Sequence, residues 1–344
     1  MVTLTAALWG ILLLWLIVFI YGIAGSVDFG AGFWAMVFFK ERHASAATIA
    51  NRYLSPLWEV TNVFLVLFAV ALVGLFPTAA FVLGNILLVP GDLILILLTI
   101  RTVFMVFAHS VDRYQHTLRI VSGITGLVIP ALLMTVFPIS EGNFLHSVDG
   151  RLTLSVPDLF RNQVVYGYVI LGITSELFLS ALLLGDYSRV AKDESAYRVY
   201  RKHVLWLGPV SILSAFLALL SIGRSAAWLQ KAMLSQWHWF LASGCFFVIG
   251  YVLVITCGWE LKRRFRWAVV SIVAQYACAM MGYGRAHLPY FVYPVVTIQD
   301  SFTNSEMFRA VIIVLILGIA VLFPGFIWFW RLFLENRAYA SKPE

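Results

Sequence analysis

The chain has 344 residues, of which 61% are hydrophobic and only 12% are charged. Soluble proteins carry about 25% charged residues, and a water-soluble core cannot bury this much apolar surface because buried area grows more slowly than chain mass. The net charge of +7 does not indicate nucleic-acid binding, because Lys and Arg fall in short segments between apolar runs and form no basic face interleaved with aromatics. Composition and charge therefore exclude a soluble globular protein and a nucleic-acid-binding protein.

Apolar runs long enough to cross about 30 Å of hydrocarbon recur along the whole chain. The first and third runs would be about 45 Å long at 1.5 Å per residue, so we expect these helices to tilt or to project beyond the bilayer. The runs predict an all-α polytopic membrane protein with about nine transmembrane helices, at residues 6–38, 54–75, 79–109, 118–138, 160–185, 203–222, 237–259, 266–285 and 307–333.

A weak internal repeat suggests that the chain has two similar halves. Asp28 lies 30 residues before Trp58, and Glu176 lies 30 residues before Trp206. Each pair joins an odd-numbered span to the next even-numbered one across a basic loop, although coincidence is the alternative explanation. We expect a single membrane domain over residues 1–344, composed of a first four-helix bundle at 1–138, a second at 160–285 and a ninth helix at 307–333.

The distribution of positive charge predicts the orientation of the chain. The loops after odd-numbered spans, together with the C-terminal tail, hold 17 of the 24 Lys and Arg residues, and the loops after even-numbered spans hold 6. Loops rich in Lys and Arg stay in the cytoplasm. The N-terminus is therefore expected outside the cell and the C-terminus inside.

Three ionisable residues are expected at similar depth on three consecutive spans. At 1.5 Å per residue, Asp28, Glu59 and Arg101 lie about 16, 8 and 12 Å from the cytoplasmic ends of their spans. Charges inside a membrane are costly and therefore suggest function. These three residues form either a structural ion cluster or the inner part of a proton path. Glu176, about 15 Å from the inner end of the fifth span, is a second-half counterpart of Asp28 with an equally open role.

Small residues around Asp28 predict close helix packing. Gly25 and Gly32 are three residues before and four after it, and hence on its face. Gly22, Ser26 and Gly30 form a small-xxx-small series on an adjacent face.

The chain offers no clear haem or metal ligands. All seven histidines lie in loops or near the expected span ends, and none shows HxxxH spacing. A haem-ligating pair in a helix bundle would need imidazoles within the spans. The three cysteines form no CxxC pair, so the sequence supports neither a zinc site nor a disulfide framework. We therefore expect no catalytic, cofactor-binding or metal-binding residue in this chain.

Several motifs together resemble subunit II of the cytochrome bd quinol oxidases. Residues 26–32, SVDFGAG, resemble the family's DGFDxGxG segment, and residues 51–62, NRYLSPLWEVTN, resemble its N…P.WD/E.NQVW segment. Arg101 matches an arginine late in the third span, and residues 290–304 resemble the loop before the last helix. The resemblance covers the chain from end to end. The chain departs from the family at Gly25, where many members carry an additional acid.

The resemblance implies a bacterial cell-membrane subunit that partners a larger subunit I carrying two b haems, haem d and the quinol site. Such a complex oxidises quinol, reduces O₂ to water and takes its protons from the cytoplasm. The family fold is two four-helix bundles and a peripheral helix, and the residues matching Asp28 and Glu59 are candidates for the proton path. A bound quinone or lipid and additional small single-helix subunits are left open.

Two alternative functions remain open on the sequence. A proton-coupled secondary transporter also needs intramembrane carboxylates and internal repeats, but it needs broken helices around a midplane site. Here the acids cluster on the cytoplasmic side, and nine spans divide poorly into inverted halves. The second alternative is a purely structural assembly subunit. Co-purification with a haem-rich partner of similar size would favour the oxidase, and its absence would favour a transporter.

Overall fold

Long helices make up most of the structure, a computed structural model that describes residues 2–39, 44–108, 115–148, 151–259 and 262–330. The side chains of residues 53–60, which include Glu59, lie outside the described part of the chain.

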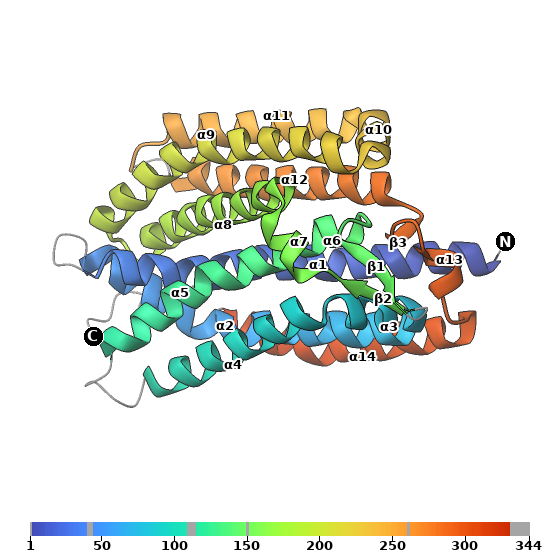
Figure 1. The fold of residues 1–344 in the computed structure, drawn as a ribbon. Coiled ribbons are helices and arrows are strands. Elements are labelled where there is room, and N and C mark those ends of the chain that lie inside the picture. The colour runs from blue at the N-terminus through green and yellow to red at the C-terminus, as the bar shows by residue number, and fades with distance from the viewer. Residues whose placement is uncertain (1, 40–43, 109–114, 149–150, 260–261, 331–344) are drawn as a thin grey trace.

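Helices of the two halves of the chain form two neighbouring groups (Figure 1). The first group consists of α1 (Val2–Val37), α2 (Ala44–Leu75), α4 (Leu88–Ala108) and α5 (Gln115–Met134), with α14 (Ser305–Trp330) beside α2. The second group consists of α8 (Gln163–Val190), α9 (Glu194–Ser225), α11 (Trp237–Thr256) and α12 (Lys262–His287). In the first group α1 packs along α2 and α5, and in the second α8 packs along α9 and α11 along α12. The two groups meet where α8 contacts α1 and α5.

Short elements gather toward the end of the bundle at which the chain begins, on the right in Figure 1. Strand β1 pairs with β2 in an antiparallel hairpin with Leu145 opposite Leu154, and β3 pairs with β4 in a second antiparallel pair. The short elements are α3 (Pro77–Ile86), α6 (Val136–Ser140), β1 (Leu145–Val148), β2 (Arg151–Leu154), α7 (Val156–Arg161), α10 (Ala227–Ser235), β3 (Tyr290–Val292), β4 (Val296–Thr297) and α13 (Ile298–Ser301).

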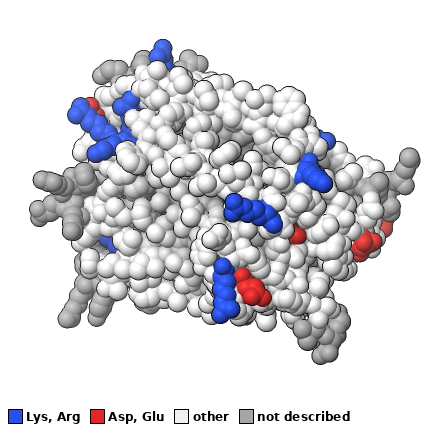
Figure 2. Space-filling view, turned by 45° about the horizontal axis from the view of Figure 1, so that its top comes forward, with Lys and Arg blue, Asp and Glu red and all other residues white. Residues whose placement is uncertain are grey.

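The surface of the helices is suited to lipid. Within the described ranges, seven helices are long and apolar enough to cross a membrane. Figure 2 shows a face on which charged residues are few and most of the surface is uncharged. Large apolar side chains point outward, such as Leu213 and Phe216 on α9 and Val314 and Val321 on α14. Because helices satisfy their own backbone hydrogen bonds, such a surface is stable in hydrocarbon. The expected all-α polytopic membrane fold is confirmed.

The third expected span, 79–109, is not one long helix. It is divided at Leu87 into α3 and α4, and a further break at Phe76 separates α3 from α2. Phe76 adopts φ −135° and ψ 62°, which lie outside the helical region. The next residue, Pro77, disfavours the helical conformation of Phe76. Pro90 lacks the N–H that would continue the hydrogen bonding of α3. In the first turn of α4, where Pro90 lies, an N–H has no partner within the helix, so no hydrogen bond is lost there. The break at Phe76 falls between the expected spans 54–75 and 79–109, whereas apolar composition did not reveal the break at Leu87.

Other helices extend further than their apolar runs. Helix α9 begins at Glu194, well before the expected residue 203. Asp193 caps it by accepting a hydrogen bond from the Ala196 backbone N–H at 2.9 Å, which satisfies one of the unpaired donors of the first turn. The first turns of α9 are polar. Hydrophobicity therefore predicted the apolar part of this helix but not the residue at which the helix begins.

Candidate functional site at the interface of the two helix groups

A buried ion pair joins α1 to α4. Arg101 Nη2 lies 3.2 Å from Asp28 Oδ1 and also donates to the Asp28 main-chain oxygen at 2.8 Å. The two side chains are only 3% and 5% exposed. Removing one partner of a buried pair leaves an uncompensated charge, at a cost of about 3–5 kcal/mol. Each of these residues therefore makes the burial of the other tolerable.

Helix α5 supplies the remaining acceptors for Arg101. Nη1 of Arg101 donates to the Ser122 main-chain oxygen at 2.7 Å and lies 3.5 Å from Thr125 Oγ1. The guanidinium also lies over the Phe29 ring, 5.1 Å from its centroid, in a cation–π contact. One side chain thus holds α1, α4 and α5 in a fixed relation.

Glycines create the space that the ion pair occupies. A Cβ atom on Gly32 would lie 2.7 Å from Ser122 Oγ and 3.1 Å from Arg101 Nη1, and a Cβ on Gly126 would collide with the Phe29 main-chain oxygen. The close packing expected at Gly32 is confirmed. Around Gly22, by contrast, a Cβ would meet nothing within 4 Å, so this member of the small-residue series makes no close contact among the described residues.

A second buried carboxyl group comes from α8. Glu176 is 2% exposed, and neither of its carboxylate oxygens has a hydrogen-bond partner among the described residues. The charges of both Arg101 and Asp28 act on it. It is brought close because α1 and α8 touch at Gly30, where a Cβ would collide with Ser180. Glu176 was predicted as the counterpart of Asp28 in the second half of the chain, but its approach to Asp28 and Arg101 was not predicted.

Tyr21 extends the polar site along α1. Its hydroxyl is buried without a hydrogen-bond partner in the described part of the chain, and the charges of Asp28 and Arg101 act on it. Tyr21, Ser122 and Thr125 were not among the residues predicted from the sequence. Tyr21 lies two turns before Asp28 and therefore on the same helix face. That spacing was the available signal.

Two other acids, Glu59 and Asp92, lie on helices of the first group. Glu59 belongs to α2, which packs along α1, but its side chain lies outside the described residues. Asp92 is an exposed residue near the start of α4, and its nine-residue separation from Arg101 places the two on different faces of the helix. The structure thus brings together Asp28, Arg101 and Glu176.

A further buried acid, Glu141, follows α6 outside the membrane-crossing segments. The Tyr168 hydroxyl hydrogen-bonds to its carboxyl group, and Asn143 Nδ2 lies 3.3 Å from Oε2. Burial raises the pKa of Glu141 to about 7, and the hydrogen bond from Tyr168 acts in the opposite direction. Arg101 is not among the groups that act on Glu141. Glu141 is therefore a buried carboxyl separate from the ion-pair site.

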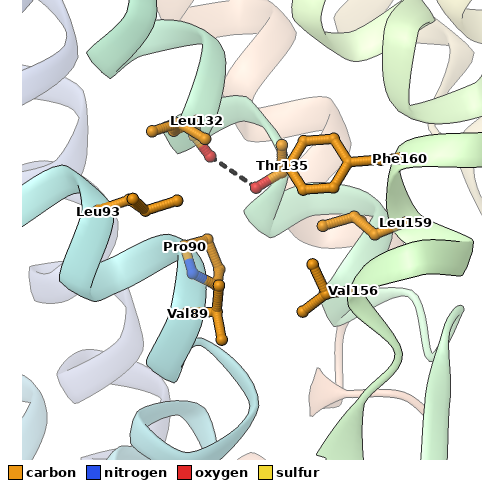
Figure 3. A pocket seen from close by; sticks show the side chains of 8 residues that line it. All are labelled: Val89, Pro90, Leu93, Leu132, Thr135, Val156, Leu159 and Phe160. Atoms are coloured by element: carbon orange, nitrogen blue, oxygen red, sulfur yellow. Dashed lines mark hydrogen bonds between the residues drawn. The ribbon is translucent and has the colours of Figure 1, made fainter.

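The pocket drawn in Figure 3 is also separate from the ion-pair site. It lies between α4, α5 and α7, and its lining includes Val89, Leu93, Leu132 and Phe160. The Thr135 hydroxyl, its one polar side-chain group, donates to the Leu132 main-chain oxygen at 2.6 Å. The pocket therefore offers a ligand apolar contacts and no free donor. Elsewhere in the described residues, no group of three His, Cys, Asp or Glu side chains could hold a metal ion.

These features define a class: a polytopic helical membrane protein with a buried charge cluster where two groups of helices meet. Residues 6–333 match the family model for cytochrome bd terminal oxidase subunit II. The chain is 43% identical over 343 residues to the putative cytochrome bd menaquinol oxidase subunit II of Bacillus subtilis (strain 168), covering 99% of both chains. It also resembles a chain of the bd oxidase from Geobacillus thermodenitrificans, with a TM-score of 0.83 and 37% identity, covering 96% of this chain and 99% of that chain.

The chain therefore belongs to the cytochrome bd terminal oxidase subunit II family, as the motifs predicted. It is a subunit of a bacterial quinol oxidase, an enzyme complex of the respiratory membrane. Membership implies a subunit I partner with haem cofactors and a quinol substrate. None of these comparisons supports the transporter or the purely structural alternative.

Proposed function

We propose that this chain conducts protons from the cytoplasm toward the O₂-reducing haem of its partner subunit. Reduction of O₂ to water consumes protons, and a haem enclosed by membrane protein has no direct access to bulk water. Ionisable groups buried between helices are a physically sound way to deliver those protons. The observation that carries the proposal is the meeting of Asp28, Arg101 and Glu176 at the interface of the two helix groups.

The proposed path involves Asp28, Glu59 and Arg101, with Glu176 as an additional acid. Glu59 is proposed as the entry because its expected depth is about 8 Å from the cytoplasmic end of its span. Arg101 supplies a positive charge that stabilises the carboxylate of Asp28 inside the membrane. A guanidinium does not lose its proton in proteins, so Arg101 is assigned an electrostatic role and not that of a carrier.

The finer features of the complex belong to the same proposal. We infer nine membrane crossings, arranged as bundles at 1–138 and 160–285 with a ninth helix at 307–333. The partner is proposed to carry two b haems and haem d. A bound quinone or lipid and small single-helix subunits are compatible with this arrangement.

The orientation, with the N-terminus outside and the C-terminus in the cytoplasm, rests on the distribution of Lys and Arg. Ser195 at the start of α9 and Ser147 in β1 are both exposed and serve as probes. In a cysteine-free background, Ser147→Cys should react with an impermeant thiol reagent in intact cells. Ser195→Cys should react only after the membrane is opened. Labelling of Ser195→Cys in intact cells would reverse the orientation.

The proton path is tested by Glu59→Gln. Glutamine keeps the shape and hydrogen bonding of the side chain but cannot cycle a proton. Turnover of quinol oxidation per haem d should fall on the order of 100-fold or more, in the range of general acid–base catalysis, while haem content stays normal. The measurement is oxygen consumption in membranes, normalised to the haem d absorbance.

Glu306→Gln is the matched control, because Glu306 is an exposed glutamate whose Arg309 contact spans a single helical turn. It should leave turnover unchanged. If Glu59 were only a structural partner, Glu59→Gln would lower haem content and leave turnover per haem d unchanged. That result would contradict proton conduction through Glu59.

A further inference from the structure

We infer that Glu176 is the residue that takes up and releases the proton, and that Asp28 with Arg101 forms a fixed pair beside it. This inference rests on the proposed proton path and divides its roles among the residues. It assigns the carrier to α8 in the second half of the chain. Asp28, on the family motif of α1, becomes a positioning residue.

The contacts of Asp28 favour a permanent charge. Its carboxylate is held by Arg101 at 3.2 Å, and its main-chain oxygen accepts a second hydrogen bond from the same guanidinium. Protonating Asp28 would leave the buried charge of Arg101 without its ionic partner, at a cost of several kcal/mol. A group whose protonation costs this much free energy is a poor proton carrier.

The surroundings of Glu176 favour a change of charge. A carboxylate that is buried without a hydrogen-bond partner is strongly disfavoured, so such a group is carried as the neutral acid. Arg101 is close enough for its charge to act on Glu176, and it acts more strongly than the opposing charge of Asp28. The neutral acid is therefore the resting form, and Arg101 lowers the cost of the anion that proton transfer requires.

The other buried carboxyls of the described residues do not share this property. Asp28 is paired with Arg101, and Glu141 is hydrogen-bonded to Tyr168. Glu176 also occupies the right place, because it lies on the helix that joins the two groups of helices, one turn from the contact between Gly30 and Ser180.

The proposed step moves one proton and no electrons. The O–H bond of the Glu176 acid breaks, its proton passes toward the haem-bearing subunit, and the carboxylate is left facing the charge of Arg101. A proton entering from the cytoplasmic side through Glu59 then forms the O–H bond again. The electrons for O₂ reduction come from quinol, through the partner subunit.

The test is Glu176→Gln in the complete oxidase. Turnover per haem d should fall about 100-fold or more with haem content unchanged. The reduced-minus-oxidised infrared spectrum should lose a band in the carbonyl-stretch region of protonated carboxyl groups. Glu176→Asp should restore a substantial part of both signals because it retains a carboxyl group. Glu141→Gln, the same change at the other buried glutamate, should leave turnover and that band unchanged.

Different results separate this inference from the proposed function. If Glu59→Gln slows turnover per haem d and Glu176→Gln does not, the proton path stands and the assignment to Glu176 is wrong. If neither variant slows turnover, the proton path itself fails. If Glu176→Gln lowers yield, turnover is still measured per haem d in the complex that assembles. Normal turnover there, or an unchanged infrared band, overturns the assignment.

Discussion

Membranes carrying Arg101→Leu are expected to contain almost no assembled oxidase. The substitution leaves Asp28 as a buried carboxylate without its counter-charge, and it deprives two main-chain oxygens, those of Asp28 and Ser122, of their charged donor. Breaking a buried pair costs about 3–5 kcal/mol, which is a large part of the 5–15 kcal/mol that stabilises a typical protein. The haem d absorbance per milligram of membrane protein measures the loss.

Two further variants show whether the cause is the ion pair. Arg198→Leu removes an exposed arginine that pairs with Glu194 on the same helix, and exposed pairs contribute about 0–1 kcal/mol, so assembly should be normal. Arg101→Lys keeps the charge but not the planar fork that reaches α1 and α5 together, so an intermediate yield is expected. A normal haem content in Arg101→Leu would show that the pair is dispensable for the fold.

The second large effect is expected at Gly126→Ala on α5. The added methyl group would collide with the Phe29 main-chain oxygen and lie 3.4 Å from Arg101 Nη1. A backbone atom cannot move aside as a flexible side chain can, so α5 must shift away from α1. Overpacking of this kind costs about 1–3 kcal/mol, and the shift also weakens the hydrogen bond from Arg101 to Ser122. Heating the purified complex and following its haem absorbance should show a midpoint several degrees lower.

Gly244→Ala on α11 is the matched control, because a Cβ there meets nothing within 4 Å. Alanine is favoured over glycine inside a helix by about 0.5–1 kcal/mol, so this variant should be as stable as the parent or slightly more stable. An equal fall in both variants would mean that the close contact between α1 and α5 is unimportant. A fall in Gly126→Ala alone would support it.

The sequence predicted the membrane helices well because lipid imposes one simple requirement. Each helix must present a long apolar surface, and the runs of apolar residues record it directly. The break at Leu87 was missed because apolar residues continue through it. The β1–β2 hairpin was missed because strands of four residues are too short to show a clear alternation of apolar and polar residues.

The site was predicted in part, and the part that was missed has a physical reason. Depth along consecutive helices placed Asp28 and Arg101 near one another, and the structure pairs them. The approach of Glu176 depends on how the two groups of helices pack, which spacing along one helix does not encode. The contribution of Ser122 comes from its main-chain oxygen, an atom that every residue type provides and that leaves no mark in the sequence.

The use of main-chain acceptors has a consequence for how this site can change in evolution. Two of the atoms that hold Arg101 belong to the polypeptide backbone of residues 28 and 122. No codon change at either position removes such an acceptor, so these contacts survive genetic drift at their own positions. Arg101 has no such protection. If its guanidinium is lost, the main-chain oxygens of residues 28 and 122 lose this donor, and no substitution at those two positions restores it. In these two main-chain contacts, Arg101 is therefore the partner that a single codon change can remove.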